Sequence, residues 1–242
     1  MNSDAADLSG RGERTTNRAL LRLIREVLTD PRFPAREPEI LELPPQKAIN
    51  PLFGMLNHGD PVIKDRAIRV FGKVVAALAD ENIERARVVM RRLIWSLNDE
   101  SGGIGWGAPE AMGEAMALHP VLAAEYAPIL LSYIDEDGNL LDYELLEEGA
   151  LWGLERLIRH RPGLLDGWEP HVIRYLGSPR ASSRGLAARL LGFSDRGETV
   201  DHLRGLLEDS GEYACIENGA RVHRKVSEVA RESIHRIQGE GP

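Results

Sequence analysis

The residues best suited to chemistry are the glycines and carboxylates of NDESGGIGWGAPEAMGE, residues 98 to 114. Gly103, Gly105 and Gly107 lead into Pro109, and proline is typical of the first turn of a helix. Such a helix start offers free N–H groups that can bind phosphate. However, no Gly-Lys-Ser/Thr sequence follows, and the surrounding carboxylates would repel an anion. The stretch therefore does not predict a nucleotide-binding loop.

A divalent metal is the second chemistry that this stretch suggests. Glu110 and Glu114 are four residues apart, so a helix would place both carboxylates on one face, with Asp99 and Glu100 nearby. Hard cations bind such oxygen ligands. The stretch contains no histidine, however, and scattered carboxylates are typical of a solvated surface. We therefore expect no bound metal and no cofactor.

Trp106 allows two further interpretations of the same stretch. It could fill a gap between helices, or it could contact a partner from an enlarged loop at residues 99 to 107. In the second case Glu110 and Glu114 would favour basic or amide-bearing partners. Our candidate partner-binding residues are therefore Trp106, Glu110, Glu114 and Trp152, and we expect no catalytic residue.

The segment EYACIENGARVHRKV, residues 212 to 226, is the one stretch with strand character. Asn218-Gly219 is a strong signal for a two-residue hairpin turn. Alternation along the two strands then sends Cys215 and His223 to opposite faces, which argues against a Cys–His nucleophile. We expect this hairpin to cover the end of the helical domain.

Basic side chains gather on two of the expected helices. The first group is Arg85, Arg87, Arg91 and Arg92, and the second is Arg156, Arg159, His160 and Arg161. No aromatic residues alternate with them, and acidic neighbours offset their charge, so we expect solvated helix faces rather than a nucleic-acid surface.

The elements that position these residues are helices. Leu20, Ile24, Val27 and Leu28 recur at helical spacing and predict a first helix near residues 17 to 29. A proline-rich connector over residues 31 to 45 is expected to be extended. We divide the chain into a disordered tail (1–16), an N-terminal helix with the connector (17–44) and a repeat domain (45–238).

The repeat domain shows a period of about 40 residues. The strings AIRVFG, APEAMG, EGALWG and AARLLG end at Gly72, Gly113, Gly153 and Gly192, which are 41, 40 and 39 residues apart. A fixed spacing with two helical segments per unit predicts stacked helical hairpins. We place the second helices near 61, 109, 143, 179 and 227, and the first near 45–57, 81–98, 121–134, 168–176 and 198–208. Each glycine would let the backbone of a neighbouring helix approach closely.

The segments LFGMLNHGD and DRAIRVFGKV resemble HEAT repeats, including the HEAT-like repeats of phycobilisome lyases, and the resemblance covers residues 45 to 238. IGWGAPEAMGE and GALWGLERL also look like parts of small bacterial HEAT-repeat proteins. The resemblance implies an all-α fold, an α-solenoid wound as a right-handed superhelix of about five helical hairpins. We expect one small β-hairpin near its C-terminus.

Composition narrows the function. The net charge of −8 argues against nucleic acid as a partner, no segment is apolar enough to span a membrane, and the single cysteine suits a reducing compartment such as the cytoplasm. We expect a non-catalytic scaffold or adaptor that binds a protein partner on its concave face. The alternative is an enzyme or chromophore-handling factor resembling phycobilin lyases, with residues 99–114 as a pocket wall. The sequence selects no oligomeric state.

Overall fold

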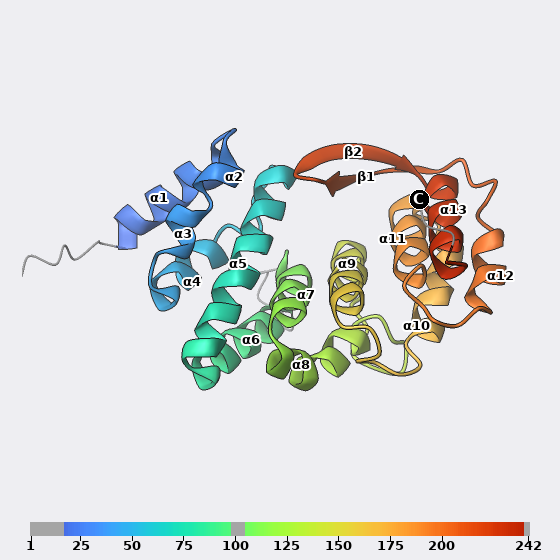
Figure 1. Ribbon diagram of the computed structural model, residues 1–242, viewed down its shortest axis with the longest axis horizontal. Helices are drawn as coiled ribbons and strands as arrows, with labels where there is room; N and C mark the ends of the chain where they lie inside the picture. Colours follow the sequence, from blue (N-terminus) through green and yellow to red (C-terminus); the bar gives the residue numbers. More distant parts are fainter. Residues whose placement is uncertain (1–16, 98–104, 240–242) are drawn as a thin grey trace, which may run out of the picture.

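A computed structural model of the chain describes residues 17–97 and 105–239 (Figure 1). The predicted disordered tail at 1–16 and most of the predicted loop at 99–107 lie outside these residues.

The described residues form five consecutive helical hairpins, as the repeat period predicts. The hairpins are α4 (Pro45–Phe53) with α5 (Pro61–Glu81), α6 (Ile83–Leu97) with α7 (Ala108–Leu118), α8 (Pro120–Ser132) with α9 (Glu144–His160), α10 (Glu169–Ile173) and the 3-10 helix η1 (Arg174–Gly177) with α11 (Ala181–Leu191), and α12 (Thr199–Arg204) with α13 (Val226–Ile237). Each α-helix of these five hairpins begins within two residues of its predicted start, which confirms the all-α solenoid.

Local capping explains why the second helix of the first hairpin begins where it does. The Asp60 side chain accepts a hydrogen bond from the backbone N–H of Val62 at 2.8 Å, and Pro61 occupies the first helical position. A capping carboxylate satisfies an N–H group that has no partner inside the helix, and proline loses nothing there.

The four repeat glycines lie where second helices of neighbouring repeats meet. A Cβ added at Gly72 would stand 2.6 Å from the Cβ of Glu114 in α7, and one at Gly113 would stand 2.3 Å from the Cα of Gly153 in α9. At Gly192 it would stand 2.6 Å from the Ser233 hydroxyl in α13. The period of the glycines in the sequence therefore reflects close contacts between neighbouring second helices.

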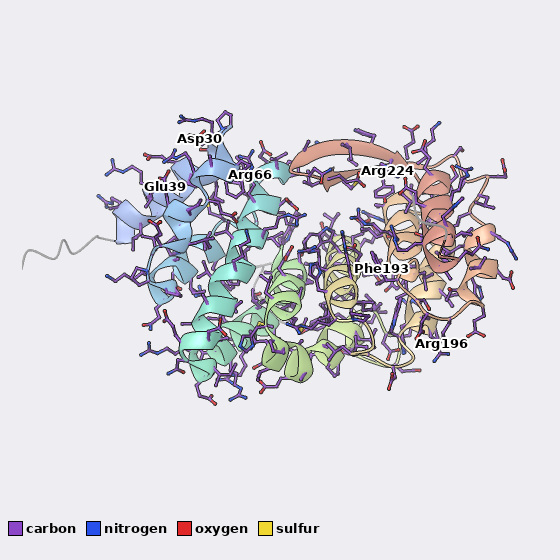
Figure 2. All side chains as sticks on the ribbon, viewed as in Figure 1. Asp30, Glu39, Arg66, Phe193, Arg196 and Arg224 are labelled. Carbon is purple, nitrogen blue, oxygen red and sulfur yellow. The ribbon has the colours of Figure 1, made fainter. Side chains whose placement is uncertain are left out.

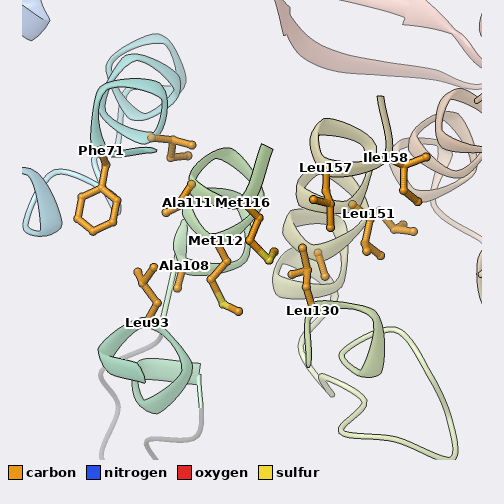
Figure 3. Packing of buried hydrophobic residues seen from close by; sticks show 14 of the residues in the cluster. Phe71, Leu93, Ala108, Ala111, Met112, Met116, Leu130, Leu151, Leu157 and Ile158 are labelled. Atoms are coloured by element: carbon orange, nitrogen blue, oxygen red, sulfur yellow. The ribbon is translucent and has the colours of Figure 1, made fainter. Parts of the chain in front are cut away.

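The core continues from repeat to repeat between the two layers of helices. Met112 and Met116 of α7 are fully buried, as are Leu130 of α8 and Leu151 and Leu157 of α9 (Figure 3). Such burial contributes about 1.5–3 kcal/mol for each large apolar side chain.

The N-terminal helix α1 (Asn17–Thr29) has its predicted bounds, but the proline-rich connector is not extended. It folds into two single-turn helices, α2 (Phe33–Arg36) and α3 (Pro38–Leu41). Pro34 and Pro38 occupy the first turns of these helices, where the missing N–H costs no hydrogen bond. Arg66 of α5 secures the connector, because its guanidinium donates to the carbonyls of Leu28 and Asp30 and lies over the Phe33 ring.

The predicted hairpin forms from β1 (Glu212–Glu217) and β2 (Ala220–Lys225), with Cys215 opposite Val222 and Ala214 opposite His223. Asn218 and Gly219 have φ values of 51° and 77°, as the tight turn requires. Its expected position at the end of the solenoid is wrong. The hairpin instead arches from α11 and α13 back to α5 and spans the inner side of the helical arc (Figure 1).

One contact explains this position. Tyr213 of β1 lies against Gly185 of α11, where an added Cβ would stand 2.1 Å from the aromatic ring. Tyr213 is 6% exposed, so the base of the hairpin is held on the inner layer of helices rather than behind it.

Candidate functional site

The hairpin, the second helices and the connector around Phe33 line an open cavity of about 730 Å³, which we call the basic cavity. Its walls come from α5, α9, α11, α13 and the hairpin tip. Figure 2 shows Arg66 on the α5 side and, on the side of α11 and α13, Arg224 at the base of β2 and Phe193 below the hairpin. Among the described residues its lining includes four carboxylates and seven arginines, namely Arg66, Arg69, Arg156, Arg159, Arg189, Arg224 and Arg236.

Several of these arginines are held by well-formed hydrogen bonds. Arg156 donates to both carboxylate oxygens of Glu114, at 2.7 and 3.0 Å. Arg69 donates to Asp65 at 2.8 Å. Burial raises the pKa of Asp65, and the hydrogen bond from Arg69 opposes that shift. These pairs make part of the cavity wall rigid and electrically balanced.

Three other arginines gather around Phe193 and Glu155, and of these Arg189 also donates a hydrogen bond to Glu217 at 3.4 Å. The guanidinium carbons of Arg159 and Arg236 lie 5.9 and 4.5 Å from the centre of the Phe193 ring. Arg159 and Arg189 approach the same oxygen of Glu155, at 3.9 and 3.4 Å. That oxygen is buried and accepts no hydrogen bond from the described residues. We call Arg159, Arg189 and Arg236 the arginine cluster.

The arginine cluster carries more positive charge than its surroundings balance. Loss of hydration lowers the pKa of Arg236, and the neighbouring Arg189 lowers it further. Among the described residues the Arg236 guanidinium has no ion pair. The Glu155 carboxylate lies between the guanidiniums of Arg159 and Arg189, and the Glu217 carboxylate, which Arg189 also meets, is shared with Arg224. Because arginine stays protonated at physiological pH, the positive charge of the cluster attracts an anion.

A second cavity of about 380 Å³, the apolar cavity, lies beside β1. Trp106, Trp152 and Leu186 line it, together with Tyr213 and Ala214 of β1. Trp152 and Ile216 border both cavities, so the two spaces adjoin beneath the hairpin.

Three of the four predicted partner-binding residues meet at the apolar cavity. Trp106, which is 36% exposed, stacks on Tyr143, and Trp152 is half-buried beneath the guanidinium of Arg69. Glu110 accepts a hydrogen bond from Lys64 at 2.7 Å.

Glu114 lines neither cavity. It is 2% exposed and faces Arg156 and Arg69, so the structure separates it from the other three candidate residues.

Gly149 and Gly107 make room for this arrangement. A Cβ at Gly149 would stand 2.6 Å from a carboxylate oxygen of Glu110. Gly107 has a φ of 80°, and a Cβ there would stand 2.3 Å from the Leu56 carbonyl oxygen. Only glycine adopts this conformation at so close an approach without strain.

The basic cavity was not predicted from the sequence. Arg156 and Arg159 were expected on a solvated helix face. The Arg159 side chain is 50% exposed, but that of Arg156 is 16% exposed and binds Glu114, and both residues line the cavity. One signal was present, because Arg69 and Arg189 each stand three residues before a repeat glycine, Gly72 or Gly192. Equivalent positions in a repeat face the same side of the solenoid.

The described residues show no arrangement typical of thiol or metal chemistry. Burial raises the pKa of the Cys215 thiol, and the nearby Glu217 raises it further. No group of three or more His, Cys, Asp and Glu in this part of the chain could hold a metal ion. None of the described helices is long and apolar enough to cross a membrane.

Comparison with known proteins gives the fold. No protein-family model and no curated protein matches the sequence. An engineered protein from the Northeast Structural Genomics Consortium is similar in structure, with a TM-score of 0.54 at 15% identity over 97% of this chain and 94% of that chain. A designed armadillo repeat protein has a TM-score of 0.50 at 14% identity, over 95% and 96% of the two chains.

A HEAT-like repeats protein from the archaeon Thermococcus onnurineus NA1 is similar at a TM-score of 0.41, with 16% identity over 91% of this chain and 80% of that chain. At such identities a likeness concerns the fold alone. The likeness to the designed armadillo repeat protein shows that the chain has an armadillo-like helical-repeat fold.

Proposed function

We propose that the chain is a non-catalytic binding protein that holds a segment of a protein partner on its concave face. The observation that supports this most directly is the pair of adjoining cavities, about 730 and 380 Å³, between the hairpin and the second helices. Both volumes are in the range of ligand-binding sites. Stacked repeats commonly use this inner surface for binding.

The side chains around the two cavities suit protein recognition. Trp106 and Trp152 offer broad apolar surface beside charged groups, and binding energy is often concentrated at tryptophan and arginine. Glu110 lines the apolar cavity and accepts a hydrogen bond from Lys64, and its negative charge favours a basic group on the partner. In this proposal Glu114 acts as a buried counter-ion for Arg156 rather than as a contact.

Site-specific photo-cross-linking tests the proposal. A benzophenone side chain replaces Trp152 on the concave face in one variant, and Trp95 of α6, which is 77% exposed, in the control. Position 152 should cross-link one defined protein that position 95 does not. Capture of the same protein from both positions, or from position 95 alone, would place the binding surface elsewhere.

The captured protein, purified separately, should bind the intact chain. Trp106→Ala should then weaken that binding by about 2 kcal/mol or more while the helical content stays unchanged. If Trp106 only fills a gap, the same substitution lowers the melting temperature and leaves the affinity at low temperature intact.

A further inference from the structure

The basic cavity has a charge opposite to that of the whole chain. The chain carries a net charge of −8, whereas seven arginines and four carboxylates line this cavity within the described residues. A cationic cavity in an acidic protein attracts anions locally and repels them elsewhere, which favours binding at this place. Two of its arginines, Arg159 and Arg236, remain solvent-exposed, so a ligand can reach them.

The arginine cluster has hydrogen-bonding capacity that the protein leaves unused. Arg159 and Arg189 approach Glu155 at ion-pair distances, 3.9 and 3.4 Å, without forming a hydrogen bond to it, and Arg189 donates one long hydrogen bond, 3.4 Å, to Glu217. Arg236 lies over the Phe193 ring and forms no hydrogen bond or ion pair among the described residues. A guanidinium presents five N–H donors that match the geometry of a carboxylate.

We propose that the basic cavity binds an acidic peptide segment, a run of aspartate or glutamate residues, with the arginine cluster as its central contact. This inference rests on the proposed function and gives the partner's chemistry. The cavity's arginines come from α5, α9, α11, α13 and the hairpin, so a segment with several carboxylates can meet more of them than a single small ion can.

Aromatic stacking keeps two of these arginines in place for a ligand. Arg159 and Arg236 both lie against the Phe193 ring, which limits the conformations that their side chains can adopt. A guanidinium that is already oriented loses less conformational entropy when it binds a carboxylate. Phe193 is therefore a positioning residue in this proposal.

Binding of a labelled hexaglutamate peptide to the full chain, measured by fluorescence anisotropy, tests the inference. Hexaglutamate should bind more tightly than hexaserine or hexalysine, and added salt should weaken its binding. Arg236→Gln should reduce the affinity about fivefold or more. Arg204→Gln, the same charge change on exposed α12, should leave the affinity within about twofold.

A second substitution should change the affinity for hexaglutamate in the opposite direction. Glu155→Gln removes the carboxylate that competes for Arg159 and Arg189, so hexaglutamate should bind several-fold more tightly. Circular dichroism confirms that each variant is folded. Should Arg236→Gln not fold, Arg159→Gln, whose side chain is 50% exposed, takes its place.

Three results would overturn the inference. They are equal binding of hexaglutamate and hexaserine, equal losses for Arg236→Gln and Arg204→Gln, and weaker binding by Glu155→Gln. Pyrophosphate that displaces hexaglutamate completely at equal concentration would show a site for a small anion instead. Cross-linking from position 152 does not depend on the partner's charge. If position 152 cross-links a protein but hexaglutamate does not bind, the acidic character of the partner is rejected and the proposed binding function is not.

Discussion

Glu114 is a buried carboxylate whose charge is balanced across a repeat boundary. Arg156 of the next repeat donates two hydrogen bonds to it, and Arg69 of the preceding repeat lies 3.5 Å away. Removal of one partner from such a pair leaves an uncompensated charge in the interior. The residue therefore links three repeats through electrostatics as well as packing.

Arg156→Ala measures how strongly this link stabilises the fold. Its side chain is 16% exposed and that of Glu114 is 3% exposed, so we expect the free energy of unfolding to fall by about 3 kcal/mol or more. Arg204→Ala, whose ion pair with Asp201 is exposed, should change it by less than about 1 kcal/mol. Urea denaturation gives both values, and equal effects would contradict a buried link.

Cys215 should be a slow nucleophile in the folded protein. Its pKa is raised, first by burial and then by Glu217, and only the thiolate reacts with iodoacetamide. We expect alkylation at pH 7 to be slower than in urea and to accelerate as the pH rises. Glu217→Gln should increase the rate at pH 7, because the thiolate then has one less negative neighbour. A folded protein that reacts as fast as the unfolded chain would contradict the raised pKa.

Residue roles could be predicted from the sequence only where they depend on neighbours along the chain. Cys215 and His223 were placed on opposite strand faces from the hairpin turn alone, and the register confirms this. The partners of Glu114 could not be identified, because Arg156 is 42 residues away and faces Glu114 only once two repeats have stacked.

At the scale of helices, the repeat glycines set the distance between neighbours. The Cβ of an alanine at Gly113 would stand 2.3 Å from the Gly153 backbone, and backbone cannot move aside as a flexible side chain can. Gly113→Ala should therefore lower the free energy of unfolding by about 3 kcal/mol. Gly177→Ala is the matched control, because no atom lies within 4 Å of its added Cβ. Chemical denaturation of both variants compares the two costs, and similar values would mean that Gly113 has no packing role.

The elements whose structure or position could not be predicted from the sequence are those held by contacts between residues far apart in the chain. Helix starts followed from caps, prolines and apolar spacing, which are local signals. The connector's short helices depend on Arg66 of α5, which binds the carbonyls of Leu28 and Asp30. The hairpin's position depends on Tyr213 lying against Gly185. Neither contact leaves a periodic trace in the sequence.

At the scale of the whole molecule, the hairpin spans an arc of helices and forms one wall of the site. Both cavities have β1 residues in their walls, and Ile216 borders each of them. The sequence predicted a concave face but not its closure, because a two-stranded hairpin can dock on any surface that accepts its side chains. The site beneath the hairpin is therefore a product of tertiary packing, although the repeat helices that line it were predictable; α2, whose Phe33 and Pro34 also line the basic cavity, was not.

A shortened hairpin tests whether the contacts between the hairpin tip and α5 keep the molecule compact. Replacement of Cys215–Val222 by Asn-Gly joins the paired residues Ala214 and His223 through a two-residue turn and keeps Tyr213 on α11. We expect unchanged helical content, faster amide hydrogen exchange at the start of α5, and a larger radius of gyration in solution scattering, because the contacts between the hairpin tip and α5 are lost. Asn218→Gly, which keeps the turn and the full strands, should behave like the original chain. Unchanged exchange and scattering in the shortened variant would show that the helices alone set the curvature, and lost helical content would show that the hairpin is part of the folding core.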